Sequence, residues 1–219
     1  MNDNYRFRTT RGVDSPRLAT LLALALAIFG IAGAVAKAST LPPESGLHAR
    51  SLAENVPWNQ PRQAITHPLG VQTLSVERKE IKREPDTSLI NVYQFNYPLE
   101  QARLISVDIS DERILANQAI ESVHLPLNDN EISFARELLS SQEGILAQLR
   151  DEQVRRGVSA FVELSQLDVK ASVFEPLDTS HPCYRQRCAL MSLFDQTRTV
   201  FSIEPVINLQ TIQVDLLKR

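Results

Sequence analysis

Hydrophobic and polar residues alternate along the middle of the chain. From Leu89 the pattern has a period of two and is rich in β-branched and aromatic residues, until Pro98 ends it. Two further apolar runs, 102–108 and 114–120, are separated by a polar turn at 110–113. The pattern predicts a three-stranded antiparallel meander.

A helical spacing follows this meander. Asn128 is a favoured N-cap residue, and Glu131 three positions later completes a capping-box pattern. Apolar residues then recur at steps of three and four over 132–139, and a second helical stretch runs from Gly144 to Gly157, where a left-handed C-cap is expected. The spacing predicts one or two helices.

The C-terminal third returns to patterns that are typical of strands. These cover 160–167 with an extension towards Phe174, then 188–194, 199–207 and 211–217. An order of strands, helix and strands predicts an α+β domain over 88–219, in which a curved antiparallel sheet packs on one or two helices.

An uncharged apolar segment, Leu18–Ala36, lies between Arg17 and Lys37 near the N-terminus. As a helix with a rise of about 1.5 Å per residue, it would extend roughly 28 Å, close to the hydrocarbon thickness of a bilayer. Basic residues are concentrated on its N-terminal side, which keeps that side cytoplasmic. The sequence predicts a single-pass membrane protein with a cytoplasmic tail at 1–17 and a periplasmic or extracellular C-terminal domain.

A cleaved signal peptide is the alternative interpretation of this segment. Ala34-Val35-Ala36 and Ala36-Lys37-Ala38 both fit the small-x-small pattern of a cleavage site. The apolar core is longer than the roughly 7–15 residues of a typical signal peptide, which favours an uncleaved anchor. Under both interpretations the folded part of the chain lies outside the cytoplasm.

The stretch from 37 to 87 is polar and interrupted by prolines, with little helical or strand periodicity. Prolines at such spacing favour extended, semi-rigid chain. We therefore expect a Pro-rich extracytoplasmic spacer between the membrane and the domain. The prolines in question are Pro42, Pro43, Pro57, Pro61 and Pro68.

Composition narrows the classes of partner. Hydrophobic residues make up 43% and charged residues 22% of the chain, which is ordinary globular usage. The net charge of −3, with dispersed basic residues, predicts no nucleic-acid partner.

The segment Val92–Leu149 resembles the small N-terminal domains of copper amine oxidases. The resemblance rests on hairpin strands with a Val107-Asp108-x-Ser110 turn, and on His124-Leu125-Pro126-Leu127 leading into Glu131 and a helix. It implies a cystatin-like α+β fold, with one helix packed on an antiparallel sheet.

The catalytic motifs of that family are missing. Copper amine oxidases use a quinone made from the tyrosine of an Asn-Tyr-Asp/Glu motif, beside copper held by three histidines, two of them in His-x-His. The two Asn-Tyr pairs of this chain, Asn4-Tyr5 and Asn96-Tyr97, are not followed by an acid. The resemblance thus implies a fold and no oxidase activity. The four histidines are far apart in the sequence, at His48, His67, His124 and His181.

His181, Cys183 and Cys188 form the one local group of residues in the sequence that could make a disulfide or a metal site. Outside the cytoplasm, two cysteines separated by four residues favour a structural disulfide that fixes a loop before a strand. The alternative is a copper or zinc site made by the two cysteines with His181. The disulfide is favoured because metal sites usually have closer cysteines or more histidines.

No phosphate-binding loop, nucleophile elbow or zinc-protease helix is present in the sequence. We therefore expect a non-enzymatic, membrane-anchored extracytoplasmic domain that needs no cofactor and acts as a protein-binding or accessory subunit. Metal handling through His181, Cys183 and Cys188 is the alternative function. The sequence does not identify the protein partner.

Overall fold

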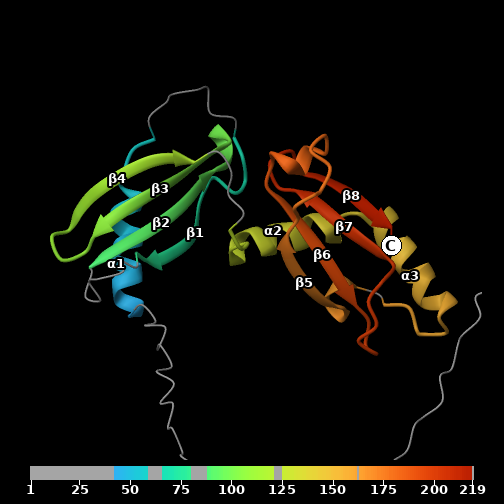
Figure 1. The fold of residues 1–219 in the computed structure, drawn as a ribbon. Helices are drawn as coiled ribbons and strands as arrows, with labels where there is room; N and C mark the ends of the chain where they lie inside the picture. The colour runs from blue at the N-terminus through green and yellow to red at the C-terminus, as the bar shows by residue number, and fades with distance from the viewer. Residues whose placement is uncertain (1–41, 59–65, 80–87, 121–124, 162, 219) are drawn as a thin grey trace, which may run out of the picture. The chain divides into compact units, whose positions relative to one another are not determined.

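The computed structural model describes residues 42–58, 66–79, 88–120, 125–161 and 163–218. All of them belong to one compact unit, Thr40–Arg219. Short 3-10 turns lie at Tyr97–Leu99, Leu164–Gln166 and Pro182–Tyr184. The helices and strands are α1 (Pro43–Glu54), β1 (Val71–Arg78), β2 (Leu89–Asn96), β3 (Gln101–Asp108), β4 (Arg113–Ile120), α2 (Asp129–Ser140), α3 (Glu143–Arg155), β5 (Asp168–Val173), β6 (Cys188–Phe194), β7 (Ile203–Asn208) and β8 (Gln213–Lys218) (Figure 1).

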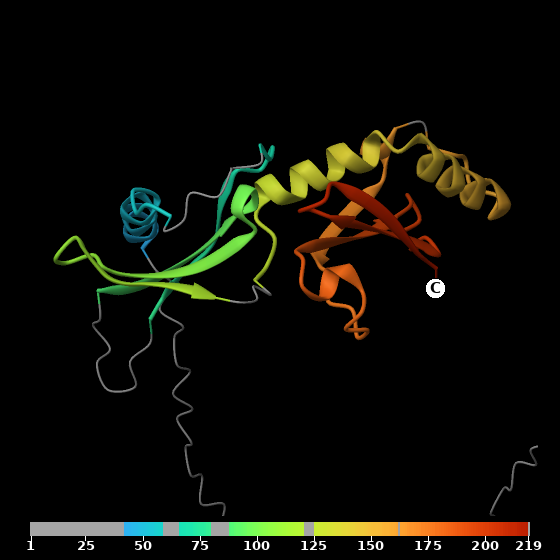
Figure 2. The same cartoon turned by 90° about the horizontal axis from the view of Figure 1, so that it is seen from above.

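The first four strands form an antiparallel sheet in the order β1-β2-β3-β4. The register shifts by one residue at Leu74 in β1 and at Leu115 in β4, so each outer strand carries a β-bulge. Helix α1 covers one face of this sheet (Figure 2). Its small side chains Ala49 and Ala53 are fully buried, which brings the helix close to the sheet. They pack on Ile90, Val92, Ile105 and Val107.

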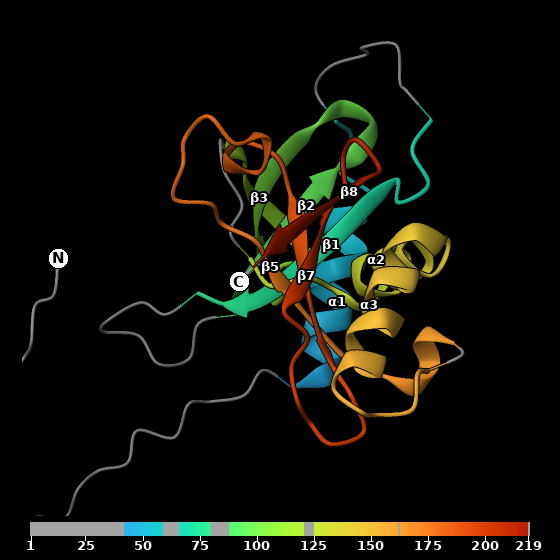
Figure 3. The ribbon, with the colours of Figure 1, turned by 90° about the vertical axis from the view of Figure 1, so that its right-hand side faces the viewer.

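The last four strands form a second antiparallel sheet in the order β5-β6-β7-β8. Helices α2 and α3 lie on one face of it (Figures 1 and 3). Leu139 and Leu149 from these helices are fully buried in a core with Met191, Leu193 and Ile207. The same core includes Phe95 and Tyr97 from the end of β2, so it joins the two sheets.

The described chain therefore contains one arrangement twice: a helical segment followed by a four-stranded antiparallel meander. The α+β class predicted from the sequence is confirmed, but its strands fall into two sheets and not into one. Each sheet pairs only strands that are neighbours in the sequence, in agreement with the general tendency of consecutive elements to lie side by side.

The prediction of an extended spacer at 37–87 is wrong for two segments, since α1 and β1 both lie within it. Pro43 occupies the first turn of α1, where its missing N–H leaves no hydrogen bond unmade. In the sequence, prolines at the start of a helix therefore look the same as prolines in an extended spacer. The rest of the predicted spacer includes residues outside those that the structure describes.

Several local predictions are confirmed. Asn128 and Glu131 form a reciprocal capping box at the start of α2, and Gly157 has the positive φ of a C-cap. The predicted strands at 89–97, 102–108, 114–120 and 188–194 correspond to β2, β3, β4 and β6. The predicted strand at 160–167 is wrong, because the described part of this stretch holds a 3-10 turn and the strand begins at Asp168.

Among the helices that the structure describes, none is both long enough and apolar enough to cross a membrane. The predicted anchor, Leu18–Ala36, lies outside the described residues.

Candidate functional site

The connection between β5 and β6, residues 174–187, contains a 3-10 turn and the first cysteine of the disulfide, and we call it the β5–β6 loop. Its first turn is organised by Asp178. The Asp178 carboxylate accepts hydrogen bonds from the main-chain N–H and the hydroxyl of Ser180, both at 2.8 Å. These hydrogen bonds lower the pKa of Asp178 below its ordinary value. The turn is therefore held by an ionised side chain at neutral pH.

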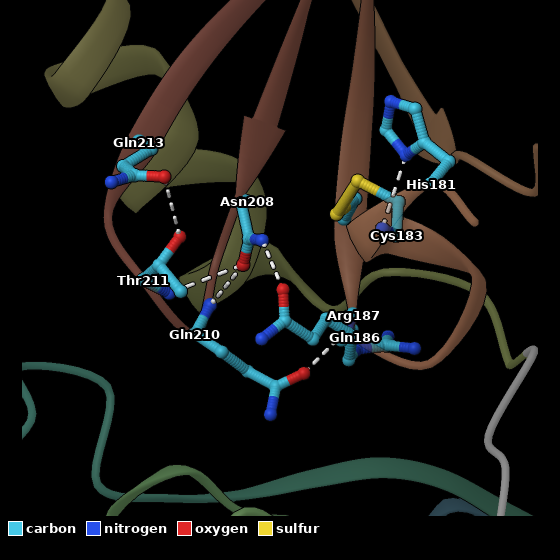
Figure 4. The surroundings of a disulfide bond; sticks show 9 residues. His181, Cys183, Gln186, Arg187, Asn208, Gln210, Thr211 and Gln213 are labelled. Carbon is cyan, nitrogen blue, oxygen red and sulfur yellow. Dashed lines mark hydrogen bonds between the residues drawn. A yellow bond between two sulfur atoms is a disulfide. The ribbon is translucent and has the colours of Figure 1, made fainter.

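His181 holds the next turn. Its Nδ1 accepts a hydrogen bond from the main-chain N–H of Cys183 at 3.1 Å (Figure 4). Its ring also contacts that of Phe174 edge to face, with the ring centres 5.5 Å apart. An Nδ1 that accepts a hydrogen bond carries no proton, so the neutral ring has its proton on Nε2. His181 is thus a structural acceptor within the loop, with Nε2–H as its remaining donor.

Cys183 and Cys188 form a disulfide, as the sequence predicted, with their Cα atoms 5.6 Å apart (Figure 4). Both cysteines are buried, Cys188 completely. They pack with Val206 into a small core that Phe174, Leu190 and Leu217 border on the face of β5–β8 opposite α2 and α3. A cross-link over so short a loop stabilises the fold by roughly 2 kcal/mol.

The disulfide also bears on the predicted metal site. Metal binding by cysteine requires thiolates, and both sulfurs are already bonded to each other. Nδ1 of His181, in addition, is engaged by the main chain. Among the residues that the structure describes, no group of three or more metal-ligating side chains comes together. His181, Cys183 and Cys188 are close in space, but the two cysteines are joined in a disulfide and His181 accepts a main-chain hydrogen bond.

The far end of the β5–β6 loop is fixed by Arg187, which sequence reasoning missed. Its guanidinium is buried and forms two hydrogen bonds to the Glu131 carboxylate, at 2.6 and 2.9 Å. It also donates to the carbonyls of Leu125 and Pro126, each at 3.0 Å. Glu131 was predicted only as a cap, because the 56 residues that separate it from Arg187 hide the pair from any local pattern.

Two side-chain amides complete the support of the loop. Gln210 accepts from the main-chain N–H of Arg187 at 2.7 Å, and Asn208 donates to the side chain of Gln186 at 2.6 Å (Figure 4). The loop is therefore held by the disulfide, by side chains from the end of β7 and the turn after it, and by Glu131 of α2.

An open, shallow cavity of about 360 Å³ lies on this supported loop. Two large side chains of the same loop, Leu177 and Tyr184, are exposed to solvent, Leu177 completely and Tyr184 by 47%. The loop thus combines two exposed large side chains with an open cavity. The cavity is lined by Thr179, Ser180, His181, Pro182, Arg185 and Gln186.

Comparisons with known proteins give only a weak structural similarity. No protein-family model matches the chain, and no curated protein matches its sequence. Among solved structures, a copper-containing benzylamine oxidase from Hansenula polymorpha is similar over 59% of this chain, with 14% sequence identity and a TM-score of 0.40. The match spans 20% of that enzyme's chain. The weak resemblance to copper amine oxidases thus extends to the structure at the level of fold, and we base no functional argument on it.

Proposed function

We propose that this chain is a membrane-anchored, extracytoplasmic and non-enzymatic domain that binds a protein partner through the β5–β6 loop. One observation carries the proposal: a loop fixed at both ends exposes Leu177 completely and Tyr184 by about half, at 47%. Exposed apolar groups on a rigid loop are suited to contact with another protein.

Rigidity matters for the affinity of such a contact. A loop that is ordered before binding loses little conformational entropy on association, so more of the contact energy appears as affinity. The Cys183–Cys188 disulfide, the Asp178 turn and the Arg187–Glu131 pair provide this order. Tyrosine adds a large contact area with only two side-chain torsions to restrict.

The compartment is supported by two independent features. A buried disulfide persists in oxidising compartments and is rare in the cytosol. The Leu18–Ala36 segment has the length, flanking charges and apolarity of a membrane anchor. Both favour a domain that lies in the periplasm or outside the cell.

The finer fold in this proposal is cystatin-like. A helix packed across a four-stranded antiparallel meander, as α1 packs on β1–β4, supports it. Such a fold serves as a scaffold for many functions, so the functional argument rests on the loop. Within the loop, Asp178 and the Nδ1 atom of His181 hold local main-chain groups, which favours a structural role over a role in proton transfer.

The loop is tested by two variants of the full-length protein in its own membrane. We expect Leu177→Asp and Tyr184→Ala each to reduce recovery of a cross-linked partner by about tenfold or more, as loss of an interface anchor does. Val154→Asp is the matched control, because Val154 is 62% exposed on α3, away from the loop. The readout is quantitative mass spectrometry of the cross-linked material.

Two outcomes would overturn the loop as the contact site. One is equal recovery of the partner by the loop variants and the wild type. The other is an equal loss with Val154→Asp, because this would indicate a general effect of surface charge.

The anchor and the compartment have their own test. We expect the protein to stay in membranes after alkaline carbonate extraction, with Leu18–Ala36 retained on N-terminal sequencing, and to have no reactive thiol until it is reduced. Cleavage after Ala36 or Ala38 would refute the anchor and leave the compartment intact. Free thiols with stoichiometric bound metal in the native protein would instead favour metal handling by Cys183 and Cys188.

A further inference from the structure

The two sheets of the described chain have four outer strands: β1, β4, β5 and β8. An outer strand presents main-chain N–H and C=O groups that have no partner within the sheet, and a strand from another chain can pair with them. Proteins normally prevent such pairing with charges, prolines, bulges or a covering segment. The four outer strands differ in how far they are protected.

The outer strands β1 and β5 each accept a main-chain hydrogen bond from a side chain of α2 or of its N-cap residue. The Asn128 amide donates to the Thr73 carbonyl of β1 at 3.0 Å, next to the bulge at Leu74. The Arg136 guanidinium donates to the Val169 carbonyl of β5 at 2.7 Å. Strand β5 also carries the exposed residues Asp168 and Lys170, and β8 carries the exposed Asp215, so these strands are charged as well.

Strand β4 has such protections only at its N-terminal end, where Arg113 and the bulge at Leu115 lie. From Ile114 to Ile120 it has neither a charged residue nor a proline. Its bulge at Leu115 leaves Ala116–Ile120 as a regular segment, paired on the inner side with Ala102–Ser106 of β3. Among the described residues, the main chain of 114–120 forms no hydrogen bond outside that pairing.

We propose that β4 pairs antiparallel with β4 of a second copy of this chain, around a two-fold axis at Gln118. The pairing joins two β1–β4 sheets edge to edge into one continuous sheet. It places Gln118 opposite Gln118 of the second copy, Asn117 opposite Ala119, and Ala116 opposite Ile120. This inference does not depend on the β5–β6 loop.

The side chains of β4 are compatible with pairing to the same strand of a second copy. Like charges that face each other oppose cross-strand pairing, and the paired residues 116–120 carry no charge. The facing glutamine amides can both donate and accept hydrogen bonds. On either side of the central Gln118 pair, the small side chains of Ala116 and Ala119 face the larger Ile120 and Asn117.

Helix α1 is compatible with this arrangement. The register places Ala116, Gln118 and Ile120 beside Ser106, Leu104 and Ala102 of β3. Ile105 and Val107 pack under α1, whereas Ala102 and Ile120 belong to the other core, so the Gln118 side chain lies on the face opposite α1. A two-fold axis perpendicular to the sheet keeps both copies of α1 on the same face.

Cysteine cross-linking of the full-length protein in its native membrane tests the pairing. We expect Gln118→Cys to give a reducible species of twice the mass, because the axis places the two Cβ atoms of residue 118 directly opposite each other. Ser172→Cys, at an exposed position of the outer strand β5, is the control and should stay monomeric. Absence of the species for Gln118→Cys, equal amounts for both variants, or a cross-link to a different protein would each overturn self-pairing.

Sedimentation of the detergent-solubilised full chain gives a second measurement. Gln118→Lys sets two ammonium groups opposite each other and should weaken dimerisation by about fivefold or more. Ser172→Lys adds the same charge to β5 and should leave dimerisation unchanged. A wild-type chain that remains monomeric, or a Gln118→Lys variant that dimerises like the wild type, would refute the proposal.

Discussion

A Glu131→Ala variant is expected to lose about 3–5 kcal/mol of unfolding free energy, because it leaves the buried guanidinium of Arg187 without its counter-charge. Glu131 is completely buried and Arg187 is 5% exposed, so water cannot replace the lost carboxylate. Since domains are stable by only about 5–15 kcal/mol, this loss would leave a marginal fold. Urea unfolding followed by circular dichroism measures it.

The Glu131 carboxylate has further partners, which is why the expected effect is large. It accepts the Tyr97 hydroxyl at 2.6 Å and the main-chain N–H of Asn128 at 2.9 Å. Burial, together with the neighbouring carboxylate, raises the pKa of Tyr97, so its hydroxyl stays protonated as a donor. Burial alone would lower the pKa of Arg187, but the hydrogen bonds and charge of Glu131 outweigh it and raise that pKa.

An exposed ion pair provides the control for Glu131. Arg50 and Glu54 are 2.7 Å apart on α1, and each side chain is about half exposed, at 50% and 48%. Glu54→Ala should therefore change the unfolding free energy by less than about 1 kcal/mol. If Glu131→Ala behaves like Glu54→Ala, the buried pair does not hold α2 to the start of β6 as we describe.

An Arg103→Ala variant is expected to release the C-terminal end of α1 and to lose about 2–4 kcal/mol of unfolding free energy. The Arg103 side chain crosses from β3 to the end of α1 and donates to the carbonyls of Val56 and Pro57 at 2.9 and 3.1 Å. It also donates twice to Gln94, and its guanidinium lies 3.9 Å from the centre of the Trp58 ring.

Removal of Arg103 leaves its acceptors without a donor, and the Gln94 amide oxygen among them is buried. Arg103 is 3% exposed and Gln94 is completely buried, so water does not readily reach their hydrogen-bonding atoms. Burial lowers the pKa of Arg103, but an arginine remains charged at neutral pH. The planar guanidinium donates both to the carbonyls at the end of α1 and to Gln94, and a lysine at this position would satisfy fewer of these acceptors.

Hydrogen exchange with mass spectrometry distinguishes release of α1 from general unfolding. In Arg103→Ala, exchange should rise first within 43–58, while β6 and β7 keep their protection. Arg113→Ala is the matched control, because Arg113 is 65% exposed and pairs only loosely with Asp111 at 3.8 Å. A uniform rise over both sheets, or no rise in 43–58, would contradict the role given to Arg103.

The elements that were predictable are those with a local cause. Asn128 and Glu131 are three residues apart, and their capping box is visible in the sequence. The strand at 188–194 follows from alternation alone, and its bounds match those of β6. The Cys183–Cys188 disulfide was predicted from the short spacing together with the extracytoplasmic location that the sequence predicts.

The helix α1 was missed because its apolar face is small. It buries Ala49 and Ala53, whose short side chains give a weak helical pattern, and it begins at a proline pair that is also typical of extended chain. Only packing on Ile90, Val92, Ile105 and Val107 selects the helix. Strand β1 was missed for a related reason, since its bulge at Leu74 interrupts the alternation.

The sequence by itself determined the α+β class, most strand segments, the capping box and the disulfide, and it predicts an anchor at Leu18–Ala36. Each of these depends on residues that are close together in the chain. The tertiary structure alone decided the division into two sheets. It also decided the distant partners of Arg103 and Arg187, such as Pro57, 46 residues from Arg103, and Leu125, 62 residues from Arg187. Such partners are chosen by burial, because a buried guanidinium must find acceptors wherever the fold provides them.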